Sequence, residues 1–153
     1  MFDYNKAFSR NIGWVTEAEQ ETLRTRRVAI AGAGGVGGIH LLTLARLGVE
    51  NFNISDFDDF EVHNFNRQSG AFMSTLGRQK VDVMAELAKD INPQSDIKSF
   101  PEGVFAHNVD EFLEGVDLYV DALDFFALEA RKVVFQKCYE KQIPVITAAP
   151  LGM

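Results

Sequence analysis

The stretch Arg27–Gly37, RVAIAGAGGVG, restricts the possible folds of this chain more than any other. Its first half is a short apolar run, Val28–Ala31, which is typical of a buried parallel strand. Its second half has the spacing G-x-G-x-x-G and leads into a helical pattern over 39–47. The glycines concerned are Gly32, Gly34, Gly35 and Gly37. Glycines let a backbone approach a phosphate closely, and the following helix offers N–H groups at its start, so this stretch predicts a nucleotide-binding unit.

Apolar runs alternate with helical patterns along the rest of the chain. Strands are predicted over 51–56, 97–100, 117–124 and 143–148, and helices over 16–26, 77–91, 108–115 and 125–141. Thr16 with Glu19 forms a capping box, and Asn108 with Glu111 is expected to cap a short helix. The alternation predicts an α/β fold: a doubly wound, mostly parallel sheet with helices on both faces, as in Rossmann-like proteins.

The chain divides at about residue 26. Residues 1–26 form an aromatic arm and a short helix, and the arm must pack on its own domain or on a second subunit. Residues 27–153 form the nucleotide-binding domain. The sequence ends with the largely apolar stretch 143–153, which predicts a truncated chain that forms the N-terminal part of a longer domain; an exposed apolar tail is the alternative.

Composition narrows the possible environment and partners. The formal net charge is −7, so a broad basic surface for nucleic acid is not expected. No apolar run reaches the roughly 20 residues of a membrane span, and no signal-peptide pattern is present at the N-terminus. The single cysteine, Cys138, is consistent with a reducing cytoplasm. We therefore expect a cytoplasmic protein that holds anions through a local cluster of donors.

Polar residues follow the carboxyl ends of the predicted strands, where ligands of such sheets bind. Asp56 lies 24 residues after Gly32, a spacing at which a carboxylate meets ribose hydroxyls, although a turn or cap aspartate has the same sequence signature. Asp124 has the chemistry of a magnesium ligand, because hard cations prefer carboxylate oxygens. Arg67 and Lys80 offer positive charge for a phosphoryl group in its transition state.

These residues together indicate a nucleoside triphosphate site. Asn64 can donate a hydrogen bond to a phosphate oxygen, and it lies in the polar segment 56–68. The sequence G-x-x-x-x-G-K-[ST] is absent from the chain, which excludes a P-loop. A dinucleotide-dependent oxidoreductase would share the glycine loop but would not need Arg67 and Lys80 at these positions.

The segments GAGGVGG, DFDDFEVHNFNRQ, LGRQKVDVMAELAKDINP and VDALD resemble those of the ubiquitin-activating-enzyme-like superfamily, the ThiF/MoeB/HesA adenylyltransferases. The resemblance runs from Arg10 to Pro150. It implies an enzyme that uses ATP and Mg²⁺ to adenylate a carboxylate, usually the Gly-Gly C-terminus of a ubiquitin-like sulfur-carrier protein. Some relatives activate other carboxylates, including one on a modified tRNA nucleoside.

The resemblance also implies residue roles. The four glycines would lie under the adenosine and the α-phosphate, and Asp56, with Asp58 beside it, would bind the ribose. Asn64, Arg67 and Lys80 would bind the polyphosphate, and Asp124 would hold the magnesium ion.

Arg10 resembles an arginine that family dimers donate across their interface to the γ-phosphate, whereas its local sequence alone suggests a surface arginine. The resemblance thus implies a homodimer. This sequence departs from the family pattern after Asp124, where Phe125 and Phe126 stand in place of the polar residue that relatives often have. Two other functions stay open: an NAD-dependent oxidoreductase, and a non-catalytic half that binds a nucleotide or a partner.

Overall fold

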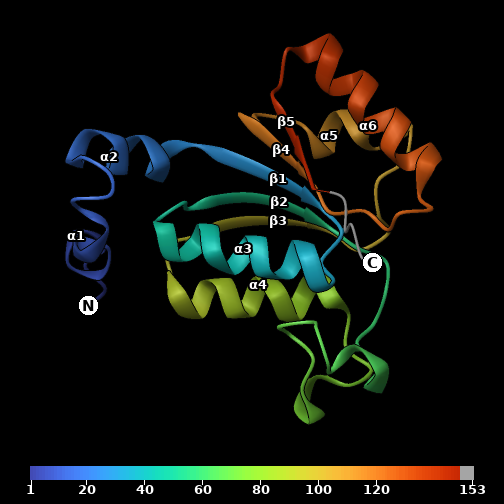
Figure 1. Cartoon of the computed structure of the whole chain (residues 1–153), viewed down its shortest axis with the longest axis horizontal. Coiled ribbons are helices and arrows are strands. Elements are labelled where there is room, and N and C mark those ends of the chain that lie inside the picture. The colour runs from blue at the N-terminus through green and yellow to red at the C-terminus, as the bar shows by residue number, and fades with distance from the viewer. Residues whose placement is uncertain (149–153) are drawn as a thin grey trace.

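A five-stranded parallel sheet forms the centre of the protein, with the strand order β3-β2-β1-β4-β5 (Figure 1). The computed structural model describes residues 1–148. The strands are β1 (Arg27–Ala31), β2 (Asn51–Ser55), β3 (Asp96–Phe100), β4 (Leu118–Asp121) and β5 (Val145–Thr147). All four neighbouring pairs are parallel. Each predicted strand region contains an observed strand, but β4 ends at Asp121 rather than at residue 124, and β5 is shorter than predicted. Residues 149–153 of the predicted domain lie outside the described residues.

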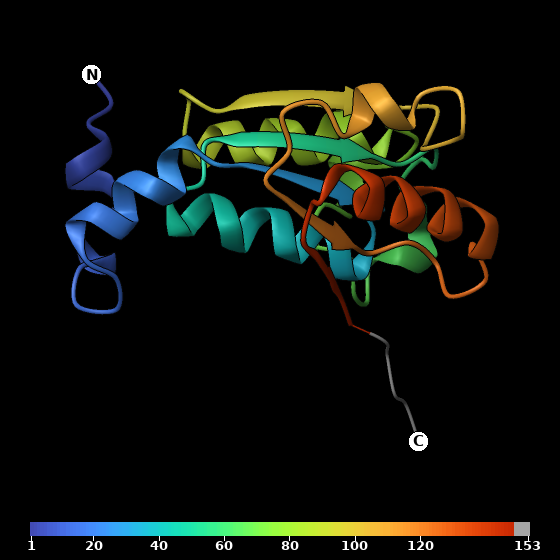
Figure 2. The same ribbon diagram turned by 90° about the horizontal axis from the view of Figure 1, so that it is seen from above.

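Helices cover both faces of the sheet. The helices α3 (Gly35–Leu47) and α4 (Lys80–Ile91) lie on one face, and α5 (Val109–Phe112) and α6 (Leu128–Lys141) lie on the other (Figures 1 and 2). Successive β1 side chains point to opposite faces. Val28 and Ile30 belong to the core under α3 and α4, while Ala29 and Ala31 belong to the core under α5 and α6. The doubly wound fold is thus confirmed.

The N-terminal arm packs at the opposite end of the sheet from the glycine loop. It consists of α1 (Tyr4–Ala7), the 3-10 helix η1 (Ser9–Asn11) and α2 (Glu17–Thr25). The Tyr4 hydroxyl donates a hydrogen bond of 2.6 Å to the Gly48 carbonyl, directly after α3. The predicted capping box of α2 is confirmed, with the Glu19 N–H donating to Thr16 Oγ1 at 3.2 Å. The arm contacts its own domain, while the division of the chain at residue 26 stays a prediction.

Two helices begin elsewhere than the sequence predicts. The helix α3 starts at Gly35 rather than at residue 39, because its first turn is built from the glycine loop itself. The helix α6 starts at Leu128 rather than at residue 125. Asp124 accepts a hydrogen bond of 3.0 Å from the Phe126 N–H, which closes a turn before the helix. Asp124 consequently lies three residues beyond the end of β4.

The predicted cap of the short helix by Asn108 is wrong. Asn108 occupies the N-cap position of α5, but its side chain makes no capping bond. It accepts from the Phe105 N–H at 2.7 Å and donates to the Gly103 carbonyl at 2.9 Å. The side chain therefore stabilises the preceding turn instead of the helix. None of the helices within residues 1–148 is both long and apolar enough to cross a membrane.

Candidate nucleotide-binding site

A cavity of about 1070 Å³ opens at the carboxyl ends of β1, β2 and β4. Three segments far apart in the sequence supply most of its lining: the glycine loop, the segment 55–68, and the segment 121–131 that joins β4 to α6. Lys80, residues 103–105 and residues 147–148 complete the lining. Among the residues singled out from the sequence, those lining the cavity are Gly32, Gly34, Gly35, Asp56, Asp58, Asn64, Arg67, Lys80 and Asp124. The structure brings these residues together, while Gly37 and Arg10 do not line the cavity.

The glycines of the loop serve two different purposes. A Cβ atom on Gly32 would lie 2.2 Å from the Ala122 carbonyl oxygen, and one on Gly37 would lie 1.7 Å from the Gly32 carbonyl oxygen. These two glycines therefore permit close packing of the loop against β4 and of α3 against the loop. Gly34 and Gly35 face the cavity, where added Cβ atoms would make ordinary contacts at 3.5 and 3.4 Å. Their backbone is the part that a phosphate could approach.

Asp56 connects the glycine loop to the segment after β2. One carboxylate oxygen accepts from the Ala33 N–H at 2.7 Å, and the other accepts from the Asp58 N–H at 2.9 Å. Burial raises the pKa of Asp56, while these two donors and the positive charge of Lys80 oppose that rise. The carboxylate lies at the cavity wall, where ribose hydroxyls could donate to it.

Lys80 begins α4 and is almost fully buried, with a side-chain exposure of 7%. Its ammonium group lies 3.0 Å from Asp58 Oδ2, and its backbone N–H donates to the Asp58 carbonyl oxygen at 3.0 Å. A buried cation needs such a partner, because desolvation of an isolated charge is costly. The pair holds the ammonium group at the cavity, where a phosphate could share it.

The 3-10 helix η2 (Val62–Asn64) and the turn after it place two further polar side chains, Asn64 and Arg67, at the cavity. Asn64 is 3% exposed and accepts a hydrogen bond of 2.9 Å from the Glu61 N–H through its Oδ1 atom. Arg67 donates to the His63 carbonyl at 3.1 Å, and its Cγ atom lies 3.4 Å from the position of a Gly35 Cβ. The arginine stem therefore lies beside the glycine loop with an exposed guanidinium.

Gln68 also lies against the loop, although sequence reasoning gave it no role. Its side chain is nearest to the Cβ position of Gly34, and the residue is more than nine-tenths buried. Within the described residues, its Oε1 atom is buried and has no hydrogen-bond partner. The signal available in the sequence was its position beside Arg67 in the NRQ segment.

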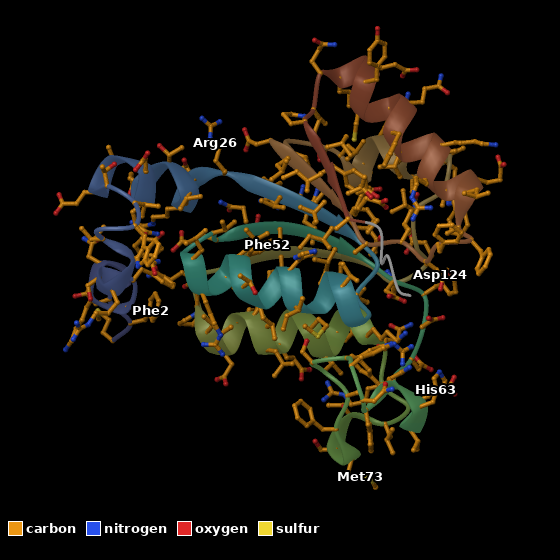
Figure 3. The ribbon with its side chains drawn as sticks, in the orientation of Figure 1. Phe2, Arg26, Phe52, His63, Met73 and Asp124 are labelled. Atoms are coloured by element: carbon orange, nitrogen blue, oxygen red, sulfur yellow. The ribbon has the colours of Figure 1, made fainter. Side chains whose placement is uncertain are left out.

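Asp124 lines the cavity as an exposed residue of the segment between β4 and α6 (Figure 3). In residues 1–148 no group of three or more histidine, cysteine or acidic residues could hold a metal ion. Mg²⁺ commonly takes one or two protein carboxylates together with substrate phosphates and water. A single carboxylate at this position fits that pattern of binding.

Arg131 of α6 is a further site residue that the sequence analysis missed. Its Nε atom donates to Asp121 Oδ2 at 2.8 Å, and the Asp121 side chain is 2% exposed. Thr147 of β5 donates to the same carboxylate oxygen at 2.9 Å. This buried pair joins β4, β5 and α6 beneath the segment that carries Asp124.

The family model described as ThiF family matches residues 8–153. The chain belongs to the ThiF family. This confirms the resemblance to the ThiF/MoeB/HesA adenylyltransferases. The relatives also include an adenylyltransferase and sulfurtransferase MOCS3 from Arabidopsis thaliana, 32% identical over 88% of this chain and 28% of that protein.

Other relatives of this ThiF-family chain act on tRNA. The tRNA threonylcarbamoyladenosine dehydratase of Bacillus subtilis is 34% identical over 142 residues, which are 92% of this chain and 55% of that protein. The crystal structure of the Escherichia coli dehydratase TcdA in complex with ATP superimposes with a TM-score of 0.88 at 28% identity, covering 94% of this chain and 58% of that one. TcdA has also been crystallised with AMP. The chain spans about half the length of these dehydratases.

The observed cavity suits the nucleotide that these ThiF-family structures contain. Gly34 and Gly35 leave the backbone of the loop accessible, and the side-chain amide of Gln68 lies beside Gly34. Arg67 and Lys80 line the same cavity and supply positive charge there. The residues present therefore fit a nucleoside triphosphate, with Asp124 available for a magnesium ion.

Arg10 lies far from this cavity. It belongs to η1 of the N-terminal arm, where the neighbouring Asn11 donates to the Leu47 carbonyl at the end of α3. The helix α3 has 13 residues and begins at the glycine loop. At 1.5 Å per residue, about 20 Å separates its two ends. Arg10 could therefore meet a nucleotide only in a second copy of the chain, and its predicted role stays a prediction.

Proposed function

We propose that this ThiF-family domain binds ATP and transfers AMP to a carboxylate, with release of pyrophosphate. The observation that carries the proposal is that Arg67 and Lys80 line the same cavity as the glycine loop. The loop offers backbone N–H donors for the α-phosphate, and the positive charges of Arg67 and Lys80 can stabilise the negative charge of the departing pyrophosphate. A dinucleotide-dependent oxidoreductase has no use for these cations, and the ATP-bound TcdA relative also favours ATP.

The reaction follows from the charge of its components. A carboxylate is already ionised at neutral pH, so one of its oxygens can attack the α-phosphorus without a general base. The bond between the α-phosphorus and the bridging oxygen breaks, and its electron pair leaves with pyrophosphate. Arg67 and Lys80 stabilise the charge that develops, and Asn64 positions a phosphate oxygen. A magnesium ion at Asp124 would neutralise part of the polyphosphate charge.

The favoured substrate is a carboxylate carried on a modified tRNA nucleoside. Three relatives at 32–34% identity are tRNA threonylcarbamoyladenosine dehydratases, and a threonyl group carries a carboxylate. Phe125 and Phe126 are 65% and 84% exposed and line the cavity beside Asp124. Exposed rings at this position give a nucleobase a surface on which to stack. Because the net charge is −7, we expect recognition of the nucleoside rather than general RNA affinity.

The Gly-Gly C-terminus of a ubiquitin-like sulfur-carrier protein is the second candidate substrate. The 32% identity to MOCS3, an adenylyltransferase and sulfurtransferase, supports it.

We also propose that the active form is a homodimer in which Arg10 of each copy reaches the nucleotide of the other. The exposed Trp14 of the same arm, at 93%, is consistent with a contact to a second subunit.

Calorimetric titration of the chain with MgATP and with NAD tests the proposal. We expect saturable binding of MgATP, weakened by Arg67→Met and by Lys80→Met. Lys132→Met is the matched control, because Lys132 pairs with Glu129 on the exposed surface of α6. Binding of NAD without ATP, or equal affinity in all variants, would refute the nucleotide assignment.

Exchange of labelled pyrophosphate into ATP tests the chemical step. We expect exchange with an RNA stem-loop that carries threonylcarbamoyladenosine, and none with the unmodified stem-loop. Exchange with a peptide ending in Gly-Gly would instead select the sulfur-carrier substrate. Tight ATP binding without exchange in either reaction would select the non-catalytic alternative.

A further inference from the structure

The guanidinium of Arg131 holds the segment that carries Asp124. Its Nη2 atom donates to the Leu123 carbonyl at 2.9 Å and to the Asp124 carbonyl at 3.2 Å, and its Nη1 atom donates to the Phe125 carbonyl at 3.3 Å. Three consecutive carbonyl groups therefore point at one side chain. The segment between β4 and α6 has no regular secondary structure here, so these bonds fix its path.

Arg131 is itself anchored in the interior of the protein. The Asp121 carboxylate accepts its Nε–H at 2.8 Å, and it also accepts from Thr147 at 2.9 Å and from the Tyr119 hydroxyl at 3.2 Å. Arg131 is thereby tied to two strands of the sheet. The anchor is rigid because the Asp121 side chain is almost fully buried, at 2% exposure.

The donors of Arg131 are nearly all in use. A guanidinium has five N–H groups, and the four bonds to Asp121 and to the three carbonyls occupy four of them. Although Arg131 lines the nucleotide cavity, little of it is left to bind a phosphate directly. Its contribution must act through the backbone that it holds.

We propose that Arg131 is a positioning residue that sets the Asp124 carboxylate for the metal ion of MgATP. This inference rests on the proposed function. The turn closed by the Phe126 N–H orients the Asp124 side chain, and Arg131 fixes the backbone on both sides of that side chain. Groups that orient a metal ligand in this way typically alter metal affinity about 10- to 100-fold when they are changed.

The substitution Arg131→Lys separates positioning from folding. A lysine keeps a positive charge near Asp121, but its single ammonium group cannot reproduce the planar fork that spans three carbonyls. The matched control is Arg26→Lys, because Arg26 forms a 2.8 Å ion pair with Asp117 at the opposite end of the sheet. If Arg131→Lys fails to fold, the double variant Asp121→Asn/Arg131→Gln keeps a neutral hydrogen bond and takes its place.

The experiment compares ATP affinity in Mg²⁺ and in EDTA, with the melting temperature as a check on folding. We expect Arg131→Lys to weaken MgATP binding about tenfold while metal-free ATP binding stays within about twofold. Asp124→Asn should give the same pattern, and adding Arg131→Lys to it should cause no further loss, because both changes act on one carboxylate.

Each of three results would overturn the inference. They are an equal loss of ATP affinity with and without Mg²⁺, full additivity of Arg131→Lys with Asp124→Asn, and wild-type MgATP affinity in Arg131→Lys. The proposed function fails in a different way, since the unaltered chain would then bind no MgATP. Wild-type MgATP binding in Asp124→Asn would place the metal ion elsewhere and would also refute the role of Arg131.

Discussion

Replacement of Gly32 by alanine tests how closely the glycine loop must approach β4. Gly32 has a φ of +92°, which L side chains rarely adopt, and its added Cβ would lie 2.2 Å from the Ala122 carbonyl oxygen. The N–H of Gly32 also bonds to the Ser55 carbonyl oxygen at 2.8 Å, which limits any movement of the loop away from β4. Gly32→Ala must therefore be destabilising on two grounds.

The two costs can be estimated separately. A positive φ in a residue with a Cβ costs roughly 1–2 kcal/mol, and forcing extra volume against a packed backbone costs about 1–3 kcal/mol. The free energy of unfolding should thus fall by about 2–5 kcal/mol. At an m-value of about 2 kcal/mol per molar urea, the urea midpoint should fall by roughly 1–2.5 M.

Urea unfolding followed by circular dichroism measures this change, with Gly13→Ala as the control. Gly13 has a φ of +111°, but its added Cβ would meet no described atom within 4 Å. The control therefore isolates the cost of the backbone conformation, and the excess loss in Gly32→Ala measures the clash with Ala122. If both variants shift the midpoint equally, the argument from close approach is wrong.

Three further predictions concern single side chains. Phe126→Ala should leave the stability and the ATP affinity unchanged, because the ring is 84% exposed. It should weaken binding of a nucleoside-borne substrate roughly tenfold, because the base loses its stacking surface. Equal substrate affinity in the variant and the unaltered chain would contradict this role. Burial raises the pKa of Cys138 to about 11, so at pH 8 only about 0.1% of the thiol is ionised. Thiol reagents should therefore modify Cys138 slowly in the folded protein and rapidly in urea. Burial also raises the pKa of Asp56 above its usual 3.8, so the amide proton shift of Ala33 should titrate with a midpoint above that value in NMR spectra and stay flat in Asp56→Asn. Because the folded pKa is the raised one, the contribution of Asp56 to stability is fully present below pH 3.8 and declines as the pH rises through the folded value.

Much of the fold could be predicted because local patterns determine it. The inner strands β1 and β4 contain short apolar runs, as expected of parallel strands that are buried on both faces, whereas the edge strand β3 is largely polar and exposed. Helix starts were less predictable. Gly35 begins α3 although glycine is a poor helix former, and in the same turn Gly37 cannot be a larger residue because its added Cβ would lie 1.7 Å from the Gly32 carbonyl oxygen. Asn108 matched a capping signal, yet the preceding turn uses its side chain.

The site was predictable only for residues whose charge or spacing carries a direct signal. Asp56, Lys80 and Asp124 follow strands or open a helix, and their grouping follows from the parallel sheet. Arg131 gave no such signal, because its role depends on three carbonyl groups that converge only after the turn following β4 has formed. Gln68 was missed for a similar reason, since its burial against the glycine loop is a tertiary contact.

The strand order has a consequence for how the protein acquires its site. The strands β1, β2 and β3 come first in the sequence and are neighbours in the sheet, whereas the later strand β4 pairs with β1 on its other side. Asp117, just before β4, accepts a hydrogen bond from the Arg27 N–H across a separation of 90 residues. Pairings between such distant segments form slowly, because a long loop must close first. The glycine loop belongs to the early half of the sheet and Asp124 to the late half. A nucleotide that contacts both the glycine loop and Asp124 would therefore bind only the fully assembled sheet. Its binding would stabilise the assembled sheet against separation of β4 and β5 from the other strands.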